Sequence, residues 1–104
     1  MTPVTLHVII KYMIKSFKHK GLGIFFKTGN TKGVNPEHSK KLRRILAMLD
    51  EIVDISEINF DSYRLHQLKG GLNGLWSMRV NGNWRITFEF KEQNVYIVDY
   101  QDYH

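Results

Sequence analysis

The sequence predicts one α+β domain, with helices in its first half and an antiparallel sheet in its second half. Apolar residues recur at helical spacing in the first half of the chain. Alternating apolar segments in the second half flank Asn81-Gly82-Asn83, a strong β-hairpin sequence. A chain of 104 residues has room for one core without disulfide cross-links.

The first part of the chain predicts a loose end and a strand of about six to ten residues, followed by a short helix. Val4–Phe17 is rich in Val, Ile, Leu and Tyr, residues that favour strands. Leu22, Phe25 and Phe26 then have the spacing of one helix face, which predicts a helix over Lys18–Phe26 with a stop at Gly29.

A second helix is predicted after residue 35. Asn35-Pro36-Glu37 combines a capping side chain, a proline suited to the first turn and a carboxylate near the positive end of the helix dipole. The apolar stripe that follows consists of Leu42, Ile45, Leu46, Leu49, Ile52 and Val53.

Four strands are predicted after this helix: Tyr63–Leu68, Leu75–Val80, Trp84–Phe90 and Val95–Tyr100. The composition of the last segment predicts a strand buried on both faces.

The register of the central hairpin follows from side-chain parity. A three-residue loop that pairs Val80 with Trp84 keeps the apolar residues of both strands on one face. The same register places Arg79 opposite Arg85 on the other face. Because like charges that face each other across strands repel, a bound anion would stabilise this pair. The register therefore predicts a phosphate site there, with two arginines that simply extend into solvent as the alternative.

Charge and composition restrict the classes of function. Fifteen Lys and Arg against ten Asp and Glu give a net charge of +5, which favours binding to nucleic acid, ribosomes or other polyanions. The absence of cysteine excludes disulfides and thiolate chemistry, and it fits a reducing, cytoplasmic location. We expect neither a signal peptide nor a membrane-spanning segment.

Few residues carry recognisable chemistry. No phosphate loop, dinucleotide-binding motif, serine triad or metal-spaced histidine cluster is present in the sequence, and we expect His7, His19 and His38 to be ordinary surface histidines. The notable group comprises His66, Lys69, Arg85 and the terminal Asp102-Tyr103-His104.

Four stretches of sequence together resemble the HigB family of toxins in the RelE/ParE superfamily. They are MIKSFKHKGL from Met13, RLHQLKG from Arg64, NWRITFEF from Asn83 and the terminal DYQDYH. The resemblance implies a RelE-like fold, a small antiparallel sheet packed against two N-terminal helices. Members of the family begin where Met13 stands, so we expect a single toxin domain over residues 13–104 and an N-terminal extension over residues 1–12.

The resemblance also implies a function and a site. It indicates a ribosome-dependent mRNA endonuclease that inhibits translation and is neutralised by a HigA-like antitoxin, with no metal, no other cofactor and no membrane partner. Cleavage would proceed by attack of the ribose 2′-hydroxyl on the adjacent phosphorus. The implied catalytic residues are His66, Lys69, Arg85, Asp102, Tyr103 and His104, with His66 and His104 as the acid–base pair.

Other basic residues are candidates for RNA binding by charge. They are Lys15, Lys18, Lys20, Lys40, Lys41, Arg43, Arg44 and Arg79. Two alternative functions share the predicted fold: a ParE-type gyrase poison, and a module that binds RNA or protein without catalysis.

Overall fold

The structure is a computed structural model that describes residues 13–58, 60–68 and 74–102. Its elements, in chain order, are α1 (Lys20–Thr28), the 3-10 turn η2 (Pro36–His38), α2 (Ser39–Leu49), the 3-10 turn η3 (Ile55–Glu57), α3 (Phe60–Tyr63), β1 (His66–Gln67), β2 (Leu75–Asn81), β3 (Trp84–Lys91) and β4 (Asn94–Asp102).

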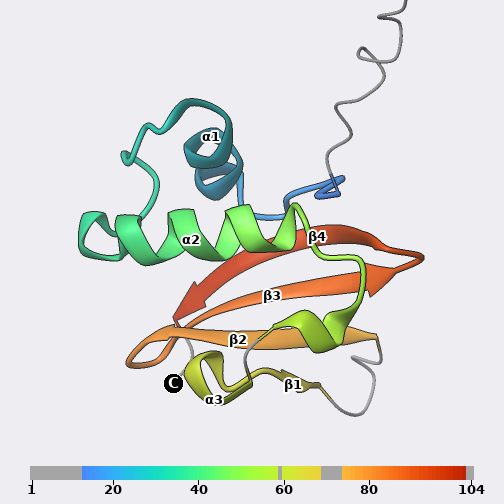
Figure 1. The fold of residues 1–104 in the computed structure, drawn as a ribbon. Coiled ribbons are helices and arrows are strands. Elements are labelled where there is room, and N and C mark those ends of the chain that lie inside the picture. Colours follow the sequence, from blue (N-terminus) through green and yellow to red (C-terminus); the bar gives the residue numbers. More distant parts are fainter. Residues whose placement is uncertain (1–12, 59, 69–73, 103–104) are drawn as a thin grey trace, which may run out of the picture.

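The four strands form one antiparallel sheet in the order β1-β2-β3-β4, and α1 and α2 lie on one side of it (Figure 1). Leu22 of α1, Leu42 of α2 and Phe88 of β3 are each fully buried in the same core. The prediction of an α+β fold with two N-terminal helices against a small sheet is therefore confirmed. In the described part of the chain, no helix is long and apolar enough to cross a bilayer.

The predicted signals at Gly29 and Asn35 are both used as caps, and His19 provides a cap that was not predicted. Nδ1 of His19 accepts a hydrogen bond from the backbone N–H of Leu22 at 2.9 Å, so α1 begins at Lys20 rather than at Lys18. Gly29 ends α1 in the left-handed conformation, with φ of 81°. The Asn35 side chain accepts from the backbone N–H of Glu37 at 3.0 Å, and the chain makes a 3-10 turn there before α2.

The apolar stripe of α2 is shorter than predicted. The helix ends at Leu49 with Asp50 as its C-cap, Ile52 is buried beyond the helix end, and Val53 is 51% exposed. The apolar spacing thus extends past the last helical turn, where Ile52 still contributes to the core and Val53 does not.

The segment before α1 lies along β4, parallel to it. Lys15 N donates to Val95 O at 2.7 Å and Lys18 N donates to Val98 O at 2.8 Å, but the segment makes only isolated bridges. The strand of about six to ten residues predicted within Val4–Phe17 is thus extended chain over the residues that the structure describes, and residues 4–12 lie outside them.

The predicted hairpin loop is wrong, but the predicted facing of the side chains is right. Asn81, not Val80, pairs with Trp84, which leaves a two-residue turn. A register shift between Arg79 and Asn81 inserts Val80 as a bulge. Without the bulge, a two-residue turn would pair an apolar residue of β2 with a polar residue of β3. The extra residue shifts the register by one, so Arg79 still pairs directly with Arg85.

Two of the other predicted strands need correction. Tyr63 ends the short helix α3, and Arg64 turns the chain with φ of 51°, so β1 comprises only His66 and Gln67 of the predicted Tyr63–Leu68. β4 is not buried on both faces, because Ile97 is 42% exposed. The two main helices cover only one side of the sheet (Figure 1).

Candidate active site

One row of side chains crosses the sheet on the face away from α1 and α2. His66 pairs with Ser77, Ser77 with Thr87, and Thr87 with Asp99. Directly paired residues project to the same side of a sheet. Their neighbours along the strands, among them Met78, face the helices and the core. His66 is therefore on the uncovered face, exposed, with Nδ1 3.0 Å from the carbonyl oxygen of Arg64.

The two arginines occupy the next row of the same face. Arg79 pairs with Arg85, and Arg85 pairs with Gln101. Arg85 is held by its own turn, since Nη1 donates to Gly82 O at 2.9 Å and to Trp84 O at 3.1 Å. By strand geometry, the Cα atoms of His66 and Arg85 lie about 12 Å apart. This spacing leaves room for one phosphodiester group between an imidazole and a guanidinium group.

The structure places the other predicted catalytic residues differently. Asp102 pairs with Trp84 at the end of β4, and its charge contributes to a raised pKa of Tyr100, whose main cause is burial. By alternation along β4, Asp102 thus belongs to the helix side of the sheet, whereas Arg85 belongs to the opposite side. Lys69, Tyr103 and His104 lie outside the described residues.

Two histidines expected at the surface are structural. His38 is only 4% exposed, and its Nδ1 lies 2.6 Å from the hydroxyl oxygen of Tyr100. Burial lowers the pKa of His38 below its ordinary value, so the ring is neutral at pH 7. His19 is half-buried as the cap of α1, with its ring edge-on to Tyr100. The prediction of surface histidines is therefore wrong for both, and His7 lies outside the described residues.

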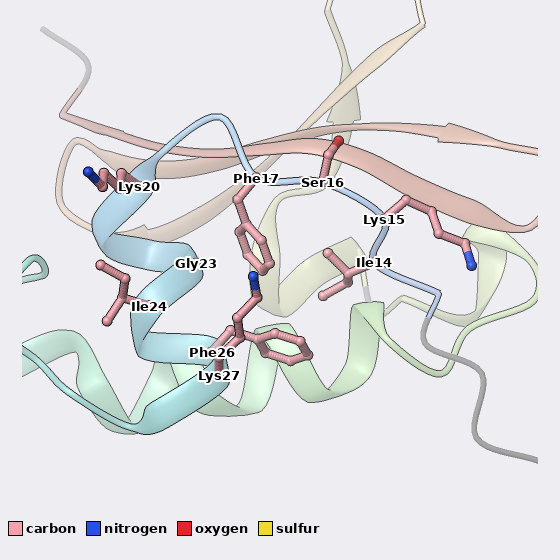
Figure 2. A pocket seen from close by; sticks show the side chains of 9 residues that line it. All are labelled: Ile14, Lys15, Ser16, Phe17, Lys20, Gly23, Ile24, Phe26 and Lys27. Atoms are coloured by element: carbon pink, nitrogen blue, oxygen red, sulfur yellow. The ribbon is translucent and has the colours of Figure 1, made fainter.

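Lys15 and Lys20 border a hollow of about 560 Å³ between residues 14–17 and α1, together with Lys27 (Figure 2). Its floor contains the rings of Phe17 and Phe26, whose centroids are 5.5 Å apart. None of the candidate catalytic residues in the described part of the chain lines this hollow.

A second group of basic residues gathers near the start of α2. Burial lowers the pKa of Lys41 below its ordinary value, and the positive charges of Arg79 and Arg44 lower it further. Nζ of Lys41 lies 5.6 Å from the centroid of the Tyr63 ring. Lys40 and Arg43 are exposed on the same helix. Together with Arg44, these side chains form a positive surface on α2.

Comparison with known proteins identifies the family. A model of the RelE-like toxins of the HigB type II toxin–antitoxin system matches residues 15–104. The chain belongs to this HigB-like toxin family. It is also 47% identical over 92 residues to a protein named Endoribonuclease HigB from Proteus vulgaris, a match that covers 88% of this chain and 100% of that protein. Membership of a type II toxin–antitoxin family implies that this toxin has an antitoxin partner.

Several polar residues of the toxin that lie beside His66 and Arg85 were not predicted from the sequence. Ser77 and Thr87 are buried on the face of the sheet away from α1 and α2, and Asp99 and Gln101 are half-buried there. The sequence does contain a signal for them. These polar residues alternate with apolar residues along their strands, which predicts that they share the face opposite the core. Within the described residues, no group of three or more His, Cys, Asp and Glu side chains has the geometry of a metal site.

Proposed function

We propose that this toxin is a ribosome-dependent mRNA endonuclease that inhibits translation in the cytoplasm and is neutralised by a HigA-like antitoxin. That it is an endoribonuclease follows from its family together with the name of its 47%-identical relative. The observation that carries the finer proposal is that His66 and Arg85 lie on the same face of the sheet, away from α1 and α2 and beside a second arginine.

In the proposed reaction, the 2′-hydroxyl of the RNA attacks the adjacent phosphorus and expels the 5′ oxygen of the next nucleotide. The products are a cyclic phosphate and a 5′-hydroxyl end. The attacking hydroxyl must lose a proton and the leaving oxygen must gain one. Histidines suit both steps because they titrate near neutral pH, and each typically contributes about 10²–10⁴-fold. We assign these steps to His66 and His104 as a pair.

The cationic residues stabilise the phosphorane that forms during attack. The guanidinium of Arg85 offers a fixed set of N–H donors, and Lys69 offers a mobile positive charge. Tyr103 contributes a hydrogen bond or a stacking surface, and Asp102 orients the tail. Because the nucleophile comes from the RNA itself, the proposed reaction needs no metal ion to generate one.

We also propose that residues 13–104 form the toxin domain and that residues 1–12 are an extension of it. The first described core residue is Ile14, and the family match begins at residue 15. The eight basic residues named above outside the catalytic group would hold RNA by charge, chiefly through the positive surface of α2.

Primer extension on an mRNA translated by purified ribosomes tests the proposal. We expect cuts with the intact toxin and ribosomes, none on the same mRNA without ribosomes, and none from a variant that lacks His104. Replacement of Lys32, which is exposed on the loop after α1, by Ala serves as the control that should cut normally. If the folded intact toxin makes no cuts, the proposal fails, and assays of DNA supercoiling then test the gyrase-poison alternative.

A further inference from the structure

The uncovered face of the sheet contains a hollow of about 240 Å³ next to the row that includes His66. Its lining residues are Lys18, Leu68, Leu75, Thr87, Ile97, Asp99 and Gln101. Pockets that enclose a whole drug-sized ligand typically measure about 300–1,000 Å³. This hollow is smaller, and it therefore suits one part of a larger ligand that continues across the sheet.

Polar side chains on one side of the hollow are held in a defined arrangement. Nε2 of Gln101 donates to Thr87 Oγ1 at 3.3 Å and to Asp99 Oδ2 at 3.0 Å. The backbone N–H of Tyr100 donates to Asp99 Oδ1 at 2.9 Å. Both amide hydrogens of Gln101 are thus engaged, so the amide can offer only its carbonyl oxygen to a ligand. Together with the Asp99 carboxylate, this side of the hollow offers hydrogen-bond acceptors.

The other walls are apolar, and one of them is strained. Leu68 and Leu75 are half-buried, and Ile97 is 42% exposed. Ile97 has φ of 47°, which is rare for a β-branched residue. This conformation coincides with a register shift between β3 and β4 at Thr87/Glu89, and the Ile97 N–H donates to Ser16 Oγ at 2.8 Å. Bulges and strained residues of this kind cluster at binding sites.

A buried hydroxyl group also lies close to the hollow. Among the residues that the structure describes, Ser77 Oγ has no hydrogen-bond partner, and it lies in the row between His66 and Thr87. A buried polar atom without a partner in a native protein calls for an explanation, and a ligand that supplies the missing bond is one. The row that leads from the candidate catalytic histidine to the hollow thus contains an unused hydroxyl group.

We propose that this hollow is the subsite for a single base of the bound RNA, and that it selects bases with an exocyclic amino group. The inference rests on the proposed endonuclease function. Adenine, cytosine and guanine can donate from an amino group to Asp99 and Gln101, while Leu68, Leu75 and Ile97 contact the faces of the base. Uracil is disfavoured, because its N–H lies between two carbonyl oxygens that would face these acceptors. Lys18 at the rim is placed to neutralise a phosphate of the same strand.

The test compares the bases that surround many cut sites in ribosome-bound mRNA, for the intact toxin and for Asp99→Asn. We expect the intact toxin to exclude uracil at one fixed position relative to the cut. The asparagine side chain of the variant retains an acceptor for the Tyr100 N–H but adds donors toward the base. The ratio of uracil to amino-bearing bases at that position should therefore rise by about 5- to 150-fold, the range expected for one base-specific contact.

Two further variants test whether the hollow itself causes the base preference. Glu89→Gln removes a carboxylate from the same face of β3 without touching the hollow, and it should leave the base preference unchanged. Ile97→Gly removes an exposed wall at a position whose backbone favours glycine, so the fold should persist while the selectivity at that position falls.

The outcomes distinguish this subsite from the proposed function. Ribosome-dependent cuts with no base excluded at any position, or an unchanged base ratio in both Asp99→Asn and Ile97→Gly, would overturn the subsite while the endonuclease function stands. If the intact toxin makes no cuts at all, the endonuclease function fails first, and the subsite fails with it.

Discussion

At the scale of single residues, the surroundings of Arg85 support its proposed role at the RNA phosphate. Its pairing with Arg79 places two positive charges on adjacent strands, and its Nη1 donates to two carbonyl oxygens of the turn. These bonds fix one end of the guanidinium group, so little side-chain entropy remains to be lost when a phosphate binds. The electrostatic cost of the pair decreases when an anion is present.

Replacement of Arg85 by Ala should therefore reduce the cleavage rate by about 10²–10³-fold, the usual loss when one donor to a developing charge is removed. The unfolding midpoint should fall little, because the side chain is only half-buried. Single-turnover cleavage and thermal unfolding measure the two effects. Full toxicity of Arg85→Ala in cells would contradict the role of Arg85 at the phosphate.

His38 predicts a dependence of stability on pH. Burial lowers its pKa in the folded state, so the unfolded chain takes up the proton more readily. The stabilising effect of the neutral ring is complete above the unfolded pKa of about 6.5 and is lost as the pH falls through the lower folded pKa. The free energy of unfolding should thus decrease with acidification below about pH 6.5.

Urea unfolding of the intact toxin and of His38→Gln, which retains an acceptor for the Tyr100 hydroxyl, measures this effect. We expect the free energy of the variant to fall less steeply between about pH 6.5 and 5. The two curves should run parallel above about pH 7, where His38 is neutral in both states. Equal slopes at low pH would show that another group controls the acid response.

At the scale of elements, the end of α2 anchors the extended segment that precedes α1. Oδ1 of Asp50 accepts hydrogen bonds from the backbone N–H groups of Met13 at 2.9 Å and Ile14 at 3.0 Å. The same segment then follows β4, where Val95 N donates to Met13 O at 2.8 Å. One carboxylate thus connects the C-cap of a helix to the chain that covers an edge strand.

We expect Asp50→Ala to lower the free energy of unfolding by about 1–3 kcal/mol, because two partly buried N–H groups lose a charged acceptor. Asp50→Asn retains an oxygen at the same place and should lose less. Chemical denaturation measures the free energy of unfolding of both variants. If Asp50→Ala is as stable as the intact toxin, these bonds do not anchor the segment.

At the scale of the whole molecule, the distribution of charge matters more than the total. The first acidic residue of the chain is Glu37, so the expected N-terminal strand and α1 contain only basic charges. The hollow beside α1 is bordered by three lysines, and the start of α2 adds the positive surface around Lys41. An acidic or polyanionic partner is therefore attracted to the helix side as well as to the arginine pair.

Binding to ribosomes should weaken as salt increases, because each phosphate that the toxin neutralises releases counterions. We expect the double variant Lys40→Gln/Arg44→Gln to reduce the slope of log affinity against log salt by about 0.7–0.9 for each phosphate that it no longer neutralises. Lys32→Gln, outside this surface, should leave the slope unchanged. Co-sedimentation of toxin with ribosomes at several salt concentrations measures this slope. An unaltered slope in the double variant would exclude α2 from the ribosome-binding surface.

Local signals in the sequence were sufficient to predict most of the elements. Residue spacing identified α1, α2 and the β2–β3 hairpin, and the capping signals at Asn35 and Gly29 are both used. These predictions succeeded because periodicity and caps act within a few residues of each other. The pairing of Arg79 with Arg85 was also predictable, since parity is a local property of two strands joined by a short turn.

What the sequence alone determined is the α+β class, the basic character and the family resemblance, which the family match confirms. Only the tertiary structure decided which side of β4 is covered, that His38 is a buried partner of Tyr100, and that Thr87, Asp99 and Gln101 meet in one hollow. The physical reason is that burial and cross-strand neighbours depend on residues distant in the chain. For His38 and Tyr100 that separation is 62 positions.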